Sequence, residues 1–200
     1  YIGYGEFKVK ALKLQRQVFC DNKREISEEE YKQLITAAEK KGNLRLALLI
    51  EAICSTGIRV SELKYITYSS LFSRRAVVDC KGKRRVIMLP QKLCMRLKTY
   101  CRDKGIGGGS VFVTRSGKPM DRSNIWKSMK KLCGSAGVSP PKVFPHNLRH
   151  LFARIFYELE KDIARLADIL GHSSIETTRV YIITSGNEHE RIIERMGLVV

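Results

Sequence analysis

Hydrophobic residues recur at helical spacing through most of the chain. Residues 28–41 repeat apolar positions three or four apart, Ser27 and Glu30 form a capping-box pattern, and Gly42 ends the run. Residues 44–54 (LRLALLIEAIC) are apolar on nearly every side, which predicts a buried central helix, and a short helix is expected from Val60. Helical spacing also predicts helices over residues 92–101, 122–134, 146–158, 162–170 and 174–183, with a last amphipathic helix over 188–195.

The period changes from helical to strand-like in the middle of the chain. Residues 76–80 (AVVDC) and 84–89 (RRVIML) predict two strands, and the basic residues between them predict the tip of a hairpin. Residues 110–114 (SVFVT) predict a further short strand. The expected fold class is therefore mainly α with a small antiparallel β-hairpin or sheet, an α+β fold.

The compact domain is expected over residues 26–185. Residues 1–25 are basic and weakly patterned, which is typical of a linker preceding such a domain. Residues 186–200 form a C-terminal tail with an apolar helical face, and such a face packs on its own domain or on another protein.

The charge of the 200-residue chain is its most unusual property. There are 37 Lys and Arg against 20 Asp and Glu, a net charge of +17. An excess of this size repels itself in a compact fold and usually serves a polyanion, so nucleic acid is the first candidate partner and an anionic membrane surface the second. The sequence contains neither an apolar run long enough to span a membrane nor the apolar core of a signal peptide near its start, so no membrane partner is expected.

The six cysteines, at positions 20, 54, 80, 94, 101 and 133, show no close pairing. None is spaced C-x-x-C, and most fall inside apolar helix or strand patterns. They are expected to be free thiols in a reducing compartment, which indicates the cytoplasm.

Three of the four histidines lie close together in the last third of the chain. The segment HNLRH places His146, Arg149 and His150 on one face of a helix, at i, i+3 and i+4. Two histidines four apart also occur in zinc-protease helices, but the glutamate base is absent here and a guanidinium would repel the metal, so neither a metal nor another cofactor is expected. The alternatives are histidines that are merely satisfied by hydrogen bonds, and an anion site, for which a guanidinium beside imidazoles is well suited.

Other candidates have an ordinary interpretation when each is taken alone. Arg59 follows a helix-breaking glycine at the start of the next helix, where it could bind an anion or form a surface salt bridge. Lys81 at the hairpin tip could be simply a solvated lysine, and Tyr181 an amphipathic core residue. His172 lies nine residues before Tyr181 in LGHSSIETTRVY, where Ser173 and Glu176 suggest a helix start.

Four motifs considered together carry a stronger signal. STGIRVSEL (55–63), KGKRRVIMLP (81–90), HNLRH (146–150) and LGHSSIETTRVY (170–181) follow one another in this order. The set resembles the catalytic domain of the tyrosine recombinase (integrase) family, which cuts and rejoins DNA. The resemblance runs from about Ser27 to the end of the chain.

The resemblance implies a role for each matched residue. Tyr181 would be the nucleophile, Arg59 and Arg149 would bind the non-bridging oxygens of the scissile phosphate, and His146 and His172 would complete the site. The leaving 5′ oxygen would receive a proton from Lys81; CKGKRR is one residue shorter than the family's usual hairpin, so Lys83 stays the alternative. The supporting residues would be Glu62, which holds the site by hydrogen bonding, and His150.

This set of residue types suits the chemistry that the resemblance implies. A free phenol has a pKa of about 10, so ionising it at pH 7 costs roughly 4 kcal/mol. Two arginines beside the attacking oxygen offset much of that cost and stabilise charge that develops on phosphorus. The departing alkoxide needs an acid, and the phosphotyrosine conserves the energy of the broken bond, so no ATP is required.

Two other functions compete with recombination. Residues 162–181 also resemble a helix-turn-helix, as in a non-catalytic DNA-binding regulator. A type IB topoisomerase would use a similar site to relax DNA. The resemblance further implies double-stranded DNA with specific recombination sites as the substrate, a homotetramer on DNA and a monomer without it, a missing N-terminal DNA-binding domain, and a tail over 186–200 that could be exchanged between protomers.

Overall fold

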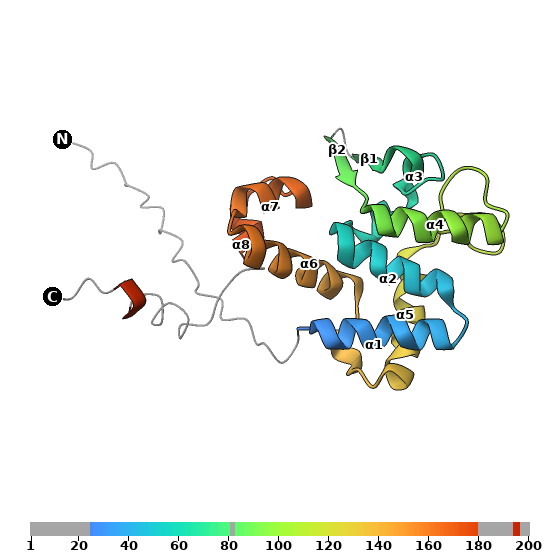
Figure 1. Cartoon of the computed structure of the whole chain (residues 1–200), viewed down its shortest axis with the longest axis horizontal. Helices are drawn as coiled ribbons and strands as arrows, with labels where there is room; N and C mark the ends of the chain where they lie inside the picture. The colour runs from blue at the N-terminus through green and yellow to red at the C-terminus, as the bar shows by residue number, and fades with distance from the viewer. Residues whose placement is uncertain (1–24, 81–82, 180–193, 197–200) are drawn as a thin grey trace, which may run out of the picture. The chain divides into compact units, whose positions relative to one another are not determined.

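The computed structural model describes residues 25–80, 83–179 and 194–196 (Figure 1). Residues 25–80 and 83–179 belong to one compact unit, and the helical residues 194–196 belong to a second unit. The elements of the first unit are α1 (Glu28–Lys40), α2 (Leu44–Thr56), η2 (Val60–Tyr65), α3 (Ser70–Ser73), β1 (Arg75–Cys80), β2 (Lys83–Met88), α4 (Gln91–Asp103), α5 (Arg122–Ala136), η3 (Pro140–Lys142), α6 (Pro145–Glu160), α7 (Ile163–Leu170) and α8 (Ile175–Arg179), where η marks a 3₁₀ helix.

The first helix begins as its sequence predicts. The Ser27 hydroxyl accepts the Glu30 N–H at 3.1 Å, and the Glu30 carboxylate accepts the Ser27 N–H at 2.9 Å. This capping box satisfies two backbone donors that the first turn of a helix leaves unpaired. The helix ends at Lys40, and Gly42 adopts a left-handed φ of +67°.

The second helix is the centre of the core, as predicted from its apolar sequence. Nine of its residues are buried, and α1, α4, α5 and α6 pack against it (Figure 1). Gly57 ends it with a φ of +63°, and a Cβ there would lie 2.6 Å from Phe152 Cδ1 and 2.9 Å from Leu170 Cδ2. A glycine is therefore required where the end of α2 meets α6 and α7.

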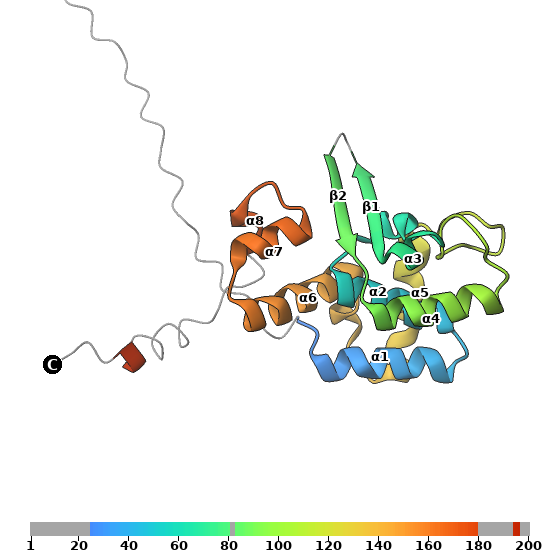
Figure 2. The same cartoon turned by 45° about the horizontal axis from the view of Figure 1, so that its top comes forward.

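The hairpin predicted in the middle of the chain is present. β1 pairs with β2 in antiparallel register from Arg75 opposite Met88 to Cys80 opposite Lys83, and β1 contacts α3 and η2 (Figure 2). The strand predicted over residues 110–114 is wrong. Two isolated bridges form there instead, Ser110 with Thr67 and Val113 with Pro119, because the backbone hydrogen bonds to residues 66–68 and 118–120 are too few to build a strand ladder.

The last described elements differ in detail from the sequence prediction. α8 begins at Ile175, and the hydroxyl of Ser174, rather than Ser173, accepts the Glu176 N–H at 3.2 Å. The predicted continuation to residue 183 and most of the predicted 188–195 helix lie outside the described residues. The prediction of a mainly α fold with a small antiparallel hairpin is confirmed. Among the described helices, none combines the length and the apolar character needed to cross a bilayer.

Candidate active site

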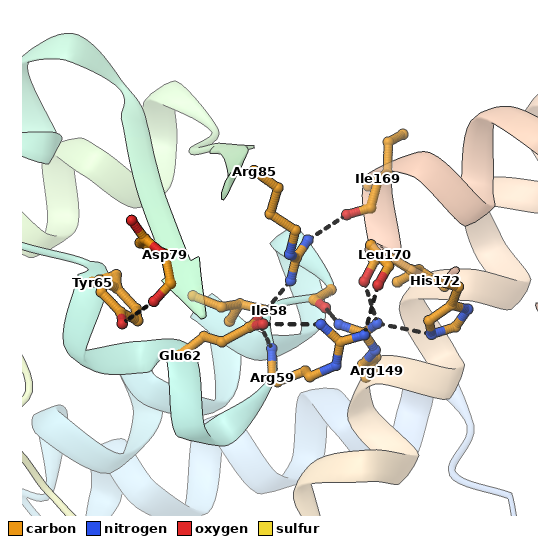
Figure 3. A network of polar contacts seen from close by, with 12 residues as sticks. Ile58, Arg59, Glu62, Tyr65, Asp79, Arg85, Arg149, Ile169, Leu170 and His172 are labelled. Atoms are coloured by element: carbon orange, nitrogen blue, oxygen red, sulfur yellow. Dashed lines mark hydrogen bonds and ion pairs between the residues drawn. The ribbon is translucent and has the colours of Figure 1, made fainter. Parts of the chain in front are cut away.

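Three arginines from three different elements converge on the C-terminal end of α7 (Figure 3). Arg85 of β2 donates to the Ile169 carbonyl, Arg149 of α6 donates to the Leu170 carbonyl, and Arg59 at the start of η2 donates to the Gly171 carbonyl. The last carbonyls of a helix have no partner within the helix and carry its negative dipole end. Guanidinium groups therefore cap this helix end, and the capping gathers their charge in one place.

Arg149 is the most deeply placed of the three, at 2% exposed. One terminal nitrogen donates to the Gly57 carbonyl at the end of α2, and the other donates to the Leu170 carbonyl at 2.6 Å. The second nitrogen also lies 3.0 Å from Nε2 of His172. Arg149 thus joins the ends of α2 and α7 to the histidine of the LGHSS segment.

Glu62 holds two of the guanidinium groups in place. Its carboxylate accepts the Arg59 N–H at 3.0 Å and the Arg59 side chain at 2.9 Å, and it accepts Arg85 at 2.6 Å. Burial alone would raise the pKa of Glu62, but the hydrogen bonds from Arg59 and the charges of Arg85 and Arg59 outweigh burial and lower that pKa. The carboxylate is therefore ionised at neutral pH.

Arg85 is a further residue of the site, and it is not among those predicted from the sequence. Its side chain is 16% exposed and links Glu62 to the Ile169 carbonyl. A Cβ on Gly171 would lie 2.6 Å from Arg85 Cδ, so the arginine packs directly on this glycine. A signal was available in the sequence, because Arg85 lies two positions from Ile87 in the predicted strand and so shares a face with this apolar residue, which is buried.

His172 sits between Arg149 and the next helix. Its Nδ1 lies 2.9 Å from the hydroxyl of Thr178, which is completely buried in α8. Burial, followed by the positive charges of Arg149 and Arg59, lowers the pKa of His172 to about 4. The imidazole is therefore neutral at pH 7.

His146 and His150 lie beside each other on α6, as their spacing predicts. Their rings meet edge to face with centroids 4.6 Å apart. Burial, the neighbouring His146 and the charge of Arg149 lower the pKa of His150 to about 3. The pKa of His146, which keeps an exposed side, is also lowered, by desolvation and by Arg149, Arg122 and Arg59.

The structure thus brings Arg59, Glu62, Arg149 and His172 into one hydrogen-bonded network, and it places His146 near Arg149 and Arg59. Lys81 and Tyr181 lie outside the described residues, and so does the side chain of Lys83, although its backbone begins β2. Within residues 25–80, 83–179 and 194–196, no three His, Cys, Asp or Glu side chains are grouped so as to hold a metal ion.

The electrostatic balance of the network favours an anion. Arg59, Arg85 and Arg149 contribute three positive charges and Glu62 one negative charge, which leaves two positive charges, while His172 is neutral. Guanidinium groups that are partly desolvated and fixed by backbone carbonyls are preorganised donors for a phosphate. The arrangement can hold a phosphodiester and stabilise additional negative charge on it.

Most of the chain is similar to known proteins. The model of the Phage integrase family matches residues 24–188. The tyrosine recombinase XerA of Pyrococcus furiosus is 30% identical over 181 residues, which cover 87% of this chain and 62% of the relative.

Two solved structures share the fold. The crystal structure of XerA recombinase superposes with a TM-score of 0.71 at 27% identity, covering 88% of this chain and 64% of the other. A lambda integrase tetramer bound to a Holliday junction superposes with a TM-score of 0.63 at 23% identity, covering 78% of this chain and 47% of the other. The chain therefore spans less than two thirds of the length of these relatives.

Proposed function

Because the chain belongs to the phage integrase family, we propose that it is the catalytic part of a site-specific tyrosine recombinase. In this proposal it breaks and rejoins double-stranded DNA through a covalent 3′-phosphotyrosyl intermediate. The observation that carries the proposal is the convergence of Arg59, Arg85 and Arg149 on three consecutive carbonyls at the end of α7, beside His172.

The proposed cleavage step uses Tyr181 as the nucleophile. Its phenolic oxygen forms a bond to phosphorus, the bond from phosphorus to the 5′ oxygen breaks, and the phenol loses its proton to solvent. Arg59 and Arg149 contact the non-bridging oxygens and stabilise the charge that builds up in the transition state. Their fixation by Glu62, Gly57, Leu170 and Gly171 means that little reorganisation accompanies the reaction.

The leaving oxygen takes its proton from a lysine at the hairpin tip in this proposal. Lys81 is the favoured donor and Lys83 the alternative, and both belong to the hairpin whose strand β2 is tied to the site through Arg85. His146 and His172 complete the phosphate site, with His150 in support. Attack by another strand's 5′ hydroxyl reverses these bond changes and releases Tyr181, so neither ATP nor a cofactor is needed.

The substrate proposal rests on charge and on the relatives. A net charge of +17 suits phosphate contacts along a duplex, so affinity should fall steeply as salt is added. Because the lambda integrase relative was solved as a tetramer on a Holliday junction, we extend the proposal to a homotetramer on DNA, formed from monomers. The tail over 186–200 would link protomers, and its deletion should then abolish cooperative assembly while leaving cleavage by single protomers intact.

Further parts of the proposal concern the rest of the protein and its location. Residues 26–185 would form the catalytic domain, residues 1–25 a linker, and a DNA-binding domain would precede them in the full protein. Cys54, Cys94, Cys101 and Cys133 are free and buried, which suits a reducing cytoplasm.

The test of the proposal is trapping of a covalent adduct. The chain is incubated with nicked DNA duplexes of randomised sequence, in which the short cleaved fragment diffuses away, and the products are separated under denaturing conditions. The wild-type chain should give DNA-linked protein and Tyr181→Phe should give none. A helix-turn-helix regulator would bind DNA without forming any adduct, and that outcome would overturn the proposal.

The same reagents separate recombination from topoisomerase activity. Supercoiled plasmid relaxed by monomers on any sequence, with no exchange between two duplexes, would indicate a type IB topoisomerase. Exchange between two duplexes that carry the selected site, without general relaxation, is the expected result.

A further inference from the structure

His172 is fixed on both sides of its ring. Nε2 lies 3.0 Å from a terminal nitrogen of Arg149, and Nδ1 lies 2.9 Å from the hydroxyl of Thr178. A guanidinium has donors only, so Nε2 must accept in this contact and the ring proton must reside on Nδ1. The Thr178 hydroxyl therefore accepts the Nδ1–H when no phosphate is bound.

A bound phosphate requires the His172 ring proton to be on Nε2 instead of Nδ1. Phosphate oxygens accept hydrogen bonds, so an imidazole that contacts one through Nε2 must carry its proton there. A threonine hydroxyl can accept or donate, unlike a carboxylate or a backbone carbonyl, and it can serve as the partner of Nδ1 in both states. Thr178 is fully buried, so water does not reach its side chain to replace it.

We propose that Thr178 is the positioning residue of the site. Its hydroxyl holds the His172 ring in one orientation. The same hydroxyl also allows the ring proton to be on Nδ1 in the free protein and on Nε2 when a phosphodiester binds. One proton leaves Nδ1 to solvent and another joins Nε2 from solvent, so the exchange has no net proton uptake. The consequence for cleavage rests on the proposed function, whereas the arrangement of protons does not.

The charges around the ring favour this exchange over protonation to an imidazolium. His172 faces the guanidinium groups of Arg149, Arg59 and Arg85 and the ring of His146, and the nearest carboxylate in the network, Glu62, is already bound to two of those guanidinium groups. A phosphodiester brings a single negative charge. A further positive charge at His172 would therefore remain unfavourable after binding.

Thr178 also connects the site to the nucleophile along the chain. It lies in α8, which packs against α7, and Tyr181 follows it three positions later in the sequence. The adjacent Thr177 belongs to the same helix but is exposed. The pair gives a matched control, because the same substitution at two neighbouring threonines differs mainly in the contact to His172.

The first measurement is nitrogen NMR of the chain labelled at its four histidines. His172 signals, assigned with His172→Gln, should show a protonated Nδ1 and an unprotonated Nε2 at pH 7. Added dimethyl phosphate, a phosphodiester with one negative charge, should exchange the two. A protonated Nε2 without ligand, an imidazolium with ligand, or unchanged signals at every ligand concentration would each overturn the proposal.

The second measurement is the single-turnover rate of adduct formation on a nicked duplex that the wild-type chain cleaves. Thr178→Val should lower the rate about tenfold to a hundredfold with DNA affinity unchanged, the range found for hydrogen-bond partners that orient metal-binding histidines. Thr178→Ser should restore most of the rate, and Thr177→Val should match the wild type. Equal rates for Thr178→Val and Thr177→Val would refute the positioning role.

The two measurements separate the inference from the proposed function. If the wild-type chain forms no adduct while the NMR signals exchange as expected, the proposed function fails and the proton arrangement stands. If adducts form normally but His172 carries the wrong proton, the positioning role fails alone. Thermal unfolding of Thr178→Val, compared with Thr178→Ser, reports any loss of folding.

Discussion

Replacing Arg85 with methionine tests whether the guanidinium network is a real energetic unit. Methionine keeps most of the length and the apolar part of the side chain, so the packing on Gly171 is largely retained. The two hydrogen bonds at 2.6 Å, to Glu62 and to the Ile169 carbonyl, are lost. Arg59 still binds Glu62, so the carboxylate keeps one of its two cationic partners.

The size of the effect follows from these contacts. A hydrogen bond that involves a charged group contributes about 1.5–3 kcal/mol, and removing one partner of a buried ion pair costs about 3–5 kcal/mol. Arg59 remains as a partner of Glu62, so the cost of breaking the ion pair is smaller than about 3–5 kcal/mol. The substitution also removes the buried Arg85 Nε, which has no hydrogen-bond partner among the described residues, and this offsets part of the loss. We expect Arg85→Met to lower the free energy of unfolding by about 2–4 kcal/mol.

The assay is urea unfolding at pH 7, with Arg84→Met as the control. Arg84 is exposed on the same strand, so its replacement should change the free energy of unfolding by less than about 0.5 kcal/mol. Arg85→Lys keeps the positive charge but loses the planar guanidinium that donates to two partners. Its free energy of unfolding should lie between those of Arg85→Met and Arg84→Met. Equal stability of Arg85→Met and Arg84→Met would show that the network contributes nothing to the fold.

Three further outcomes are expected. First, His150 has a folded pKa of about 3, below the ordinary value of 6.5, so the unfolded chain binds more protons between these values and stability should fall as the pH drops from 6.5. Urea unfolding at pH 7, 6 and 5 measures the decline. If the unfolding free energy of His150→Gln fell with pH as steeply as that of the wild type, this account would be contradicted. Second, Gly57→Ala should cost about 2–4 kcal/mol from left-handed strain and the clash with Phe152. Gly137→Ala, at a φ of +66° with nothing within 4 Å, should show only the strain, and equal losses would refute the packing argument. Third, the melting temperature should be higher in sulfate than in chloride of equal ionic strength. At a sulfate concentration ten times its Kd, the difference should correspond to about 1.4 kcal/mol of added stability. Arg59→Met should lose most of this difference, and the same rise in both proteins would indicate a general salt effect.

The elements that the sequence predicts well are those set by local interactions. The capping box of Ser27 and Glu30 and the apolar run of α2 depend on residues a few positions apart. The strand expected over residues 110–114 was wrong because alternation shows that a segment could pair and says nothing of a partner. The neighbouring segments, residues 66–68 and 118–120, each make a few backbone hydrogen bonds and one bridge, which is too short a pairing for a strand.

In the candidate site, too, local features could be predicted from the sequence and long-range contacts could not. The motifs around Arg59, Arg149 and His172 could be found in the sequence, whereas their common attachment to the end of α7 could not, because those contacts join residues far apart along the chain. Arg85 was overlooked because an arginine in a basic hairpin is usually a solvated one. Thr178 was overlooked because nothing local distinguishes it from its exposed neighbour.

The central claim is that these groups surround one phosphate of DNA and that Tyr181 attacks it. Mass spectrometry of the trapped adduct, after digestion of protein and DNA, tests it most directly. The account predicts a nucleotide attached through its 3′ phosphate to the peptide that carries Tyr181. A link at another residue, or through a 5′ phosphate, would contradict it.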